Sequence, residues 1–201
     1  MNILKRKIGE KSVVLSRELV DNKSLIADLW ETERLIIRDA NLLDVDSLQE
    51  IYIQSQSAEG WTRDHEVTTD YILNGVKQGN LPPNGMKEFY KIQLITLKDS
   101  ARIVGFIEFY HGYPDKEVLY IATLLFCEDC RNNGYGQEVI NKLCEQALEL
   151  GFRQARLGVT LRNWSGLYFW TKLGFNTILK YHGDKVLAKD SFALLVLGKT
   201  L

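Results

Sequence analysis

The chain has 201 residues, of which 45% are hydrophobic and 25% charged, so it is long enough to form one sizeable core. Its formal net charge of −1 gives no reason to expect nucleic acid or an anionic membrane surface as a partner. No apolar run reaches the roughly 20 residues that span a bilayer, and no signal peptide is evident, so we expect a cytoplasmic protein.

The cysteines do not indicate a disulfide framework, because Cys127, Cys130 and Cys144 are few and odd in number. Cys127 and Cys130 have the spacing of zinc ligands, but there is no second such pair and the three histidines are scattered singly. We therefore expect reduced thiols and no metal. Cys144 falls on an apolar helical stripe, where it serves as a small hydrophobic residue.

The first part of the chain combines a poorly patterned segment with the start of a folded domain. Residues 1–30 are interpreted as an N-terminal appendage, with a helix expected from Glu18 to Leu29. The alternation in Glu33–Arg38 predicts a strand, and apolar spacing predicts helices over 44–56 and 69–77.

Three apolar runs follow, and turn residues separate them. The runs Tyr90–Leu97, Ile103–Tyr110 and Val118–Phe126 predict consecutive antiparallel strands, because short polar turns connect them. An amphipathic helix then ends at Gly151, a favourable C-terminal glycine. The next apolar run, Gln154–Thr160, is expected to lie parallel to the last strand of the meander through a right-handed crossover.

The end of the chain predicts one more helix and a hairpin. Asn163 to Leu173 has the pattern of a short helix, and the segments 177–182 and 191–197 flank Gly183-Asp184. The sheet is therefore expected to be mixed. No internal repeat or linker is found, so residues 31–201 are expected to form one domain.

The stretch Arg131–Gly136 joins the third strand of the meander to the amphipathic helix. Its two glycines permit positive φ angles and a close approach of the backbone to a ligand. The amides of the first helical turn point outward with a partial positive charge. This layout is typical of a turn that binds phosphate or pyrophosphate, although many turns carry glycines only to close a connection.

Four features in this order resemble the Gcn5-related N-acetyltransferase (GNAT) superfamily. They are Glu33–Leu35 near the first strand, the meander, the glycine turn, and Asn163 ahead of Lys172–Phe175. The opening Thr-Glu-Arg-Leu is similar in style to the ribosomal-protein N-acetyltransferase-like branch. The resemblance covers about residues 31–198 and implies an α+β fold, in which helices flank a central mixed, mostly antiparallel sheet.

The resemblance implies acetyl transfer from acetyl-coenzyme A (acetyl-CoA) to a primary amine that attacks the thioester directly. It places the pantetheine arm on the backbone of Leu124, Leu125 and Phe126, in a strand that splays from its parallel neighbour. An amide near Leu125 or Phe126 would then polarise the thioester carbonyl, a contact worth roughly 3 to 4 kcal/mol elsewhere. The residues expected to hold the pyrophosphate are Arg131, Asn132, Asn133, Gly134, Tyr135, Gly136 and Gln137.

Two further family positions concern the helix that follows. Asn163 is expected either to meet the pantetheine arm or to cap its own helix, and both roles stay open. Many members carry a tyrosine that protonates the leaving thiolate four residues before the final glycine, where this chain has Trp170. An indole N–H donates a hydrogen bond but is no ordinary acid. Tyr168 lies about 200° around the helix from Trp170 and is expected to pack elsewhere.

A primary amine must lose a proton before it attacks, so a base is needed. Glu108 and Glu117 are the candidates, acting through water, although a solvated or ion-paired carboxylate is an alternative for each. The family's base position falls near Tyr120 instead. His111 is a third candidate, but a single histidine at a strand end is usually structural.

Two other functions compete with this hypothesis. A catalytically impaired acyl-CoA-binding module would keep the fold and the turn without proton transfer. A dinucleotide-binding enzyme is disfavoured, because three antiparallel strands precede the glycines.

The acceptor is not fixed by the sequence. A protein N-terminus, a polyamine, an amino sugar and a small metabolite all fit. A loop with the residues Trp61, Asp64, His65 and Glu66 is a candidate for the acceptor side, and homodimers are common in the superfamily.

Overall fold

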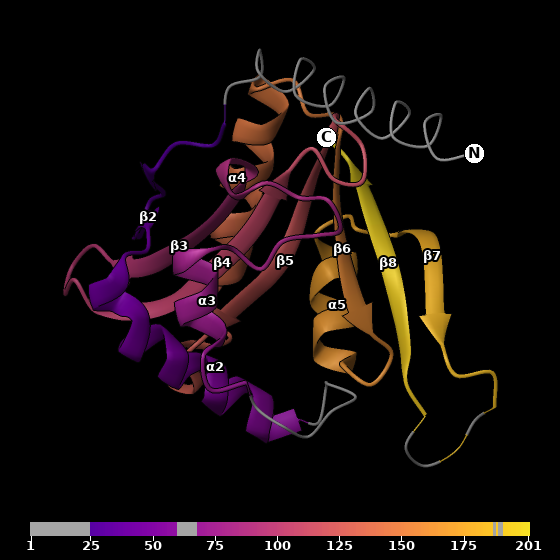
Figure 1. The fold of residues 1–201 in the computed structure, drawn as a ribbon. Coiled ribbons are helices and arrows are strands. Elements are labelled where there is room, and N and C mark those ends of the chain that lie inside the picture. Colours follow the sequence, from indigo (N-terminus) through magenta and orange to yellow (C-terminus); the bar gives the residue numbers. More distant parts are fainter. Residues whose placement is uncertain (1–24, 60–67, 187, 189–190) are drawn as a thin grey trace, which may run out of the picture.

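The computed structural model describes residues 25–59, 68–186, 188 and 191–201. Eight strands form one sheet in the order β1-β2-β3-β4-β5-β6-β8-β7 (Figure 1). Of the strand pairs formed by these residues, only β5 and β6 are parallel, so the sheet is mixed and mostly antiparallel, as the sequence predicts. The strands are β1 (Leu29–Glu31), β2 (Leu35–Asp39), β3 (Tyr90–Leu97), β4 (Ile103–His111), β5 (Val118–Phe126), β6 (Gln154–Thr160), β7 (Thr177–Gly183) and β8 (Ala193–Thr200).

In the described part of the chain, two pairs of helices cover the two faces of the sheet, and each pair seals one apolar cluster. On one face, α4 and α5 pack over a cluster that includes Ile107, Leu143 and Trp170. On the other face, α2 and α3 pack over a cluster that includes Leu48, Ile72 and Phe106 (Figure 1). The helices are α2 (Val45–Glu59), α3 (Tyr71–Lys77), α4 (Tyr135–Glu149) and α5 (Trp164–Lys172), with 3₁₀ turns η1 (Leu42–Asp44), η2 (Lys87–Phe89) and η3 (Glu128–Cys130). Among the described residues, none of these helices has the length and apolar character needed to cross a membrane.

The segment just before residue 31 belongs to the sheet. The helix expected from Glu18 to Leu29 is wrong in its described part, because residues 25–28 form no helix and Leu29 begins β1. Ile26 and Trp30 are buried in the cluster beneath α4, and the Trp30 indole donates to Gln93 at 2.8 Å. Burial of these two apolar side chains outweighs the weak helical pattern, so the fold begins by residue 26.

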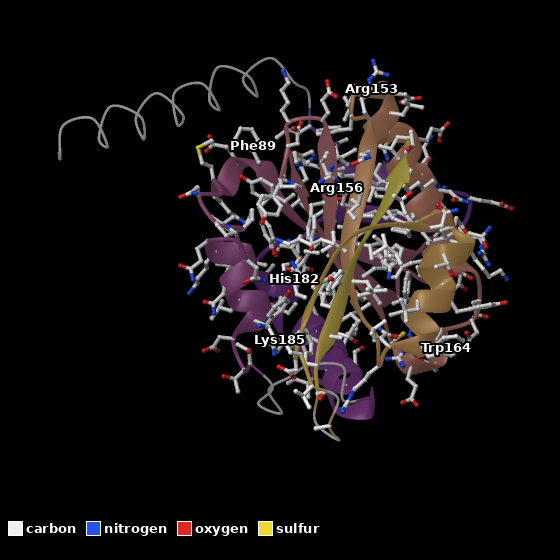
Figure 2. The ribbon with its side chains drawn as sticks, turned by 90° about the vertical axis from the view of Figure 1, so that its right-hand side faces the viewer. Phe89, Arg153, Arg156, Trp164, His182 and Lys185 are labelled. Atoms are coloured by element: carbon white, nitrogen blue, oxygen red, sulfur yellow. The ribbon has the colours of Figure 1, made fainter. Side chains whose placement is uncertain are left out.

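The strand β7 closes the sheet at the opposite side from β1. All seven of its residues are exposed, including Ile178 and Tyr181. Figure 2 looks onto this edge and shows His182 on it, with Trp164 of α5 projecting to one side. β7 is therefore held mainly by its pairing with β8 and contributes little to either core.

Candidate functional site

The parallel strands β5 and β6 separate partway along their length. Their pairing ends at Ile121 and Leu157, yet β5 continues along β4 to Phe126 and β6 continues along β8 to Thr160. At their carboxyl ends, the backbone groups on the facing edges of β5 and β6 therefore do not bond to each other. Backbone groups without partners are costly unless water or a ligand satisfies them, so this opening is suited to a polar, extended ligand.

The pairing of β5 with β4 decides which backbone groups face the opening. The Cys127 amide donates to the Val104 carbonyl at 2.9 Å, which makes that pair a hydrogen-bonded one. Because such pairs alternate along an antiparallel ladder, Leu125 also pairs with β4, whereas the N–H and C=O of Leu124 and Phe126 point toward β6. Of the three residues expected to contact pantetheine, Leu124 thus offers both backbone groups to the opening and Leu125 offers neither. Phe126 offers its amide, while its carbonyl accepts from Arg131 Nε.

A β-bulge sets this alternation. Thr123 lies opposite Glu108 and Ile121 lies opposite Phe109, so Ala122 is an extra residue in β5. Before the bulge, the odd-numbered residues of β5 face β6. After it, the even-numbered residues do, which brings the edges of Leu124 and Phe126 to the opening.

The glycine turn forms the expected connection from β5 to a helix. Gly134 has φ 80° and Asn132 has φ 62°, and α4 begins at Tyr135, two residues earlier than expected. Gly134 occupies a conformation that disfavours other residues, and it stands at the N-cap of α4 without a side-chain cap. The first amides of α4, including those of Gly136 and Gln137, have no acceptor within the helix and point at the space before it.

The second glycine has a different role from the one expected. The φ of Gly136 is not positive. A Cβ on Gly136 would lie 3.0 Å from the Phe169 ring, so this glycine permits close packing of α4 against α5. The expectation of two positive-φ glycines is therefore correct for Gly134 alone.

The side chains of the turn mainly hold the turn together. Arg131 donates from Nε to the Phe126 carbonyl at 3.3 Å and from Nη2 to the Ser55 hydroxyl at 3.1 Å. The Asn133 amide donates to the carbonyls of Cys130 and Arg131, both at 3.1 Å. These bonds tie the turn to α2 and to the end of β5, so its amides are fixed in space.

Asn163 serves as the cap of α5. Its Oδ1 accepts from the Gly166 amide at 2.7 Å and from the Ser165 hydroxyl at 3.2 Å. One of its two expected roles is therefore confirmed, and contact with a cofactor stays a prediction.

The helix α5 brings no acid to the opening. Trp170 is 9% exposed and packs edge-on against Phe169 and Phe175 within the core beneath α4. Tyr168 is 59% exposed, with the Lys172 ammonium 5.1 Å from its ring centroid. The two residues thus lie on different sides of the helix, as their spacing predicts.

Glu108 lies at the centre of a polar cluster on the face covered by α2 and α3. Its side chain is buried and accepts from the Tyr71 hydroxyl at 2.6 Å, from the Asn80 amide at 2.8 Å and from the Tyr90 hydroxyl. The Tyr71 hydroxyl also lies 3.2 Å from the Thr123 hydroxyl of β5, beside the opening. The cluster therefore links a buried carboxylate to the strand that carries Leu124.

The two tyrosines of this cluster stay protonated. Burial, followed by the neighbouring Glu108 carboxylate, raises the pKa of both the Tyr71 and the Tyr90 hydroxyl. Both hydroxyls therefore act as donors to Glu108 at neutral pH. Tyr71, Asn80 and Tyr90 were missed in the sequence, because they come from three separate segments and only the fold brings them to one carboxylate.

The other sequence candidates for a base lie away from the opening or have other roles. Glu117 is exposed in the turn before β5, at the opposite end of the strand from Phe126. His111 is buried, its Nε2 accepts from the Ile26 amide at 3.1 Å, and its Nδ1 lies 2.8 Å from the Phe89 carbonyl. These two bonds fix a neutral tautomer and give His111 a structural role.

Tyr120, at the family's base position, lies on the α2 and α3 face of β5 and packs edge-on against Tyr113. Its hydroxyl lies 3.3 Å from where a Cβ on Gly158 would stand. Burial raises its pKa, so it is a poor base. The candidate acceptor loop with Trp61, Asp64, His65 and Glu66 falls outside the described residues.

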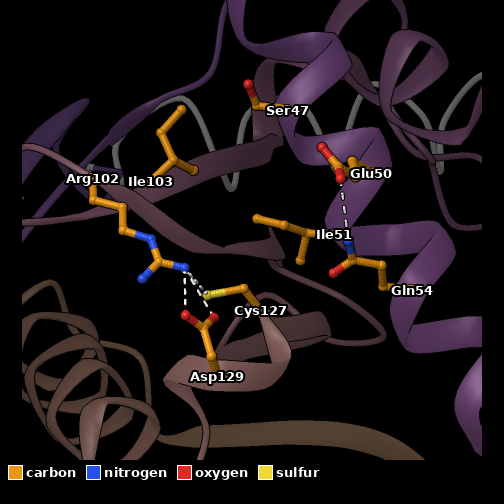
Figure 3. Close-up of a pocket in the computed structure, with 8 residues that line it drawn as sticks. All are labelled: Ser47, Glu50, Ile51, Gln54, Arg102, Ile103, Cys127 and Asp129. Carbon is orange, nitrogen blue, oxygen red and sulfur yellow. Dashed lines mark hydrogen bonds and ion pairs between the residues drawn. The ribbon is translucent and has the colours of Figure 1, made fainter.

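A second polar region surrounds a pocket of about 330 Å³ between α2 and the ends of β4 and β5. Figure 3 shows Arg102 reaching Asp129 and Cys127 on one side, with Glu50 and Gln54 of α2 on the other. Arg102 donates to both oxygens of Asp129, at 2.9 and 2.7 Å. The pocket lies beside the turn rather than in the opening between β5 and β6.

Cys127, Asp129 and Cys130 have ligand atoms within 4.8 Å of one another, a grouping that the cysteine spacing alone only half reveals. Burial, with help from Cys130 and Asp129, raises the pKa of the Cys127 thiol to about 12. A structural zinc site needs four ligands and thiolates. The three side chains are one ligand short of that number, and Arg102 already holds the Asp129 carboxylate.

The fold and the opening define the class of this protein, which is that of the acetyltransferase fold. Solved acetyltransferases share it at low sequence identity. One from Thermus thermophilus has a TM-score of 0.63 at 20% identity, covering 86% of this chain and 100% of its own. A GNAT-family acetyltransferase from Bacillus anthracis has a TM-score of 0.64 at 18% identity, covering 86% and 98%.

A third solved structure is NAA60 from Arabidopsis thaliana in complex with a bisubstrate analogue, with a TM-score of 0.60 at 14% identity, covering 83% of this chain and 99% of its own. No curated protein matches the sequence. The family model described as the acetyltransferase (GNAT) family matches residues 58–175, more than half of the chain. The chain therefore belongs to the GNAT acetyltransferase family.

Proposed function

We propose that this protein transfers the acetyl group of acetyl-CoA to a primary amine by direct attack. The observation that carries the proposal is the opening between β5 and β6, which ends at the N-terminus of α4. A pantetheine arm pairs well with the backbone of Leu124 and Phe126, and a pyrophosphate suits the amides after Gly134. The cytoplasm, where acetyl-CoA and reduced thiols occur together, is the expected compartment.

The thioester carbonyl is best placed beside an amide of β5 that faces the opening. Such an amide is a fixed dipole directed at the oxyanion that develops when the amine attacks. The alternation along β5 favours the Phe126 or Leu124 amide for this role over the Leu125 amide, which is engaged with β4.

For the proton of the amine, the route through Glu108 is better supported than one through Glu117. The Tyr71 hydroxyl donates to Glu108 and accepts from the Thr123 hydroxyl, so one lone pair is left to accept from a group near Thr123. In this proposal, the ammonium gives its proton to Tyr71 while Tyr71 passes its own to Glu108. The neutral amine then attacks the thioester, the C–S bond breaks, and the departing coenzyme A thiolate takes the second proton that the nitrogen loses. Trp170 takes no part, because it packs in the core and lacks an acidic proton.

Binding of acetyl-CoA is the first test, and it needs no knowledge of the acceptor. Isothermal titration of the purified chain should show saturable binding of acetyl-CoA. Gly134→Val should abolish it, because a β-branched residue at φ 80° distorts the turn. Gly151→Val is the matched control, since Gly151 has φ 83° at the far end of α4 and should carry similar strain without loss of binding.

A screen of amines separates the two candidate functions. The protein is incubated with acetyl-CoA and, in turn, polyamines, amino sugars, amino acids and peptides with free N-termini, and release of coenzyme A is measured. Release that depends on one class of amine supports the transferase. Tight binding without release from any acceptor would favour the impaired acyl-CoA-binding module, and no binding at all would overturn both. An acceptor that is a peptide N-terminus would fit the ribosomal-protein-like branch. The oligomeric state is a separate question, and analytical ultracentrifugation would test for a homodimer.

A further inference from the structure

The segment Thr32–Leu35 lies against the first turns of α4, and Glu138 is the point of contact. The Glu138 carboxylate accepts from the Thr32 hydroxyl, from the Arg34 amide at 2.8 Å and from Arg34 Nε at 2.7 Å. The Arg34 Nη2 also forms an ion pair with Oε2 of Glu138 at 2.7 Å, and the Glu138 side chain is only 16% exposed. A short segment more than 100 residues away in sequence thus surrounds this carboxylate.

Arg34 also spans the glycine turn itself. Its Nη1 donates to the Asn133 carbonyl at 3.0 Å, and its guanidinium carbon lies 4.6 Å from the centroid of the Tyr135 ring. Its Nη2 would lie 3.4 Å from a Cβ on Gly134. One side chain therefore contacts or borders three successive residues of the turn, and it is fixed by Glu138 while doing so.

Because Glu138 carries a negative charge at the N-terminus of α4, its contact with Arg34 affects how well an anion binds there. Although burial opposes it, the hydrogen bonds from Thr32 and from the amide and guanidinium of Arg34 hold the pKa of Glu138 below its usual range. Glu138 is thus ionised at neutral pH in the first turn of α4, where it opposes the binding of a second anion. Arg34 cancels that charge, so the N-terminus of α4 keeps its attraction for a pyrophosphate.

We propose that Arg34 is a positioning residue for the coenzyme, which holds the glycine turn in shape and neutralises Glu138 so that the pyrophosphate binds. The inference rests on the proposed function and adds a residue to it. It assigns a task to the Thr32–Leu35 segment that neither its resemblance to a branch of the family nor its place before β2 explains. The roles of the turn amides are unchanged.

The test is isothermal titration with coenzyme A at low salt, on the whole chain. Arg34→Met keeps the packing over Tyr135 and removes the charge and the hydrogen bonds, so it should weaken binding about five- to tenfold. Arg38→Met is the matched control. Arg38 is similarly exposed and pairs with Asp44 through both guanidinium ends, at 2.9 and 2.8 Å, but Asp44 is not on α4. The binding constant of Arg38→Met for coenzyme A should stay within about twofold of the wild-type value.

Two further measurements separate the charge from a mere loss of structure. The double variant Arg34→Met with Glu138→Gln should bind more tightly than Arg34→Met alone, because the uncompensated carboxylate is gone. The deficit of Arg34→Met should also shrink in about 0.5 M salt, where the Debye length is only on the order of a few ångströms. Thermal unfolding confirms that each variant is folded.

The outcomes decide as follows. Equal binding by the wild type and Arg34→Met overturns the inference and leaves the proposed function standing. A double variant as weak as the single one, with a salt-independent deficit, overturns the neutralising role. A wild type that does not bind coenzyme A overturns the proposed function, and the inference falls with it.

Discussion

Two regions of the molecule hold a glutamate in opposite ways. Glu108 is fully buried under α2 and α3, and it accepts from the neutral donors Tyr71, Asn80 and Tyr90. Glu138 lies at the rim of the glycine turn and is held by the cation Arg34. The first arrangement is fixed by packing and insensitive to the solvent, whereas the second is an ion pair that salt and pH can alter. A carboxylate's task follows from its partners rather than from its residue type.

Removal of Glu108 should have the largest effect on stability. Glu108→Ala leaves two hydroxyls and an amide without their acceptor and opens a cavity, so we expect a loss of about 3 to 5 kcal/mol in the free energy of unfolding. Urea denaturation followed by circular dichroism measures it. Glu117→Ala is the matched control, since that exposed residue should change stability by less than about 0.5 kcal/mol. A loss below about 1 kcal/mol for Glu108→Ala would show that the cluster is not held by its carboxylate.

Removal of one donor should cost less than removal of the acceptor. Tyr71→Phe keeps the stack on Tyr52, whose ring lies 4.2 Å away, but deletes the hydroxyl between Glu108 and Thr123. We expect a loss of about 1 to 2 kcal/mol in stability and, with an acceptor from the amine screen, roughly a tenfold or greater loss of turnover at neutral pH. Tyr168→Phe, on the exposed side of α5, should change neither. Normal turnover in Tyr71→Phe would remove the relay from the mechanism.

The ion pair at the rim should contribute less stability than the buried cluster. Glu138→Gln should lower the free energy of unfolding by about 1 kcal/mol, because Arg34 is 45% exposed and solvent screens the pair. Denaturation at low and high salt tests this. The deficit should decline in high salt, whereas the deficit of Glu108→Ala should not. The same salt response in both variants would erase the distinction between the two regions.

The pH dependence of stability should be the smallest effect, and it should come from Glu138 at the rim of the glycine turn. Because the folded pKa of Glu138 lies below its usual value of 4.5, its contribution is fully present above that value and is lost as the pH falls through the lowered folded pKa. The difference in melting temperature between wild type and Glu138→Gln should therefore be constant above about pH 5.5 and diminish in more acidic solution. A difference that grows toward low pH would contradict the assignment.

Local patterns predicted most of the fold but less of the site. The meander, the parallel strand β6 and the helix α4 follow from apolar period and glycine placement, and all three are present. Gly134 and the cap at Asn163 were found because backbone conformation and capping leave signals within a few residues. The Glu108 cluster and the contact between Arg34 and Glu138 left none, since each joins segments that are distant in sequence. The strand β1 was missed because three residues are too few to show an alternating pattern.

The extra residue Ala122 reverses the alternation of β5, so odd-numbered residues face β6 before it and even-numbered residues face β6 after it. Substituting a side chain after the bulge leaves this alternation unchanged, because the groups that face the opening belong to the backbone. Deleting Ala122 would remove the bulge and leave Thr123 opposite Glu108 in a regular ladder. One residue inserted after Thr123 would instead return the edges of Leu124 and Phe126 to β4 and turn the edge of Leu125 toward the opening. In this stretch, the residues whose backbone faces the opening are set by their distance in sequence from the bulge rather than by their identity, so a residue gained after the bulge is the change that should affect the opening most.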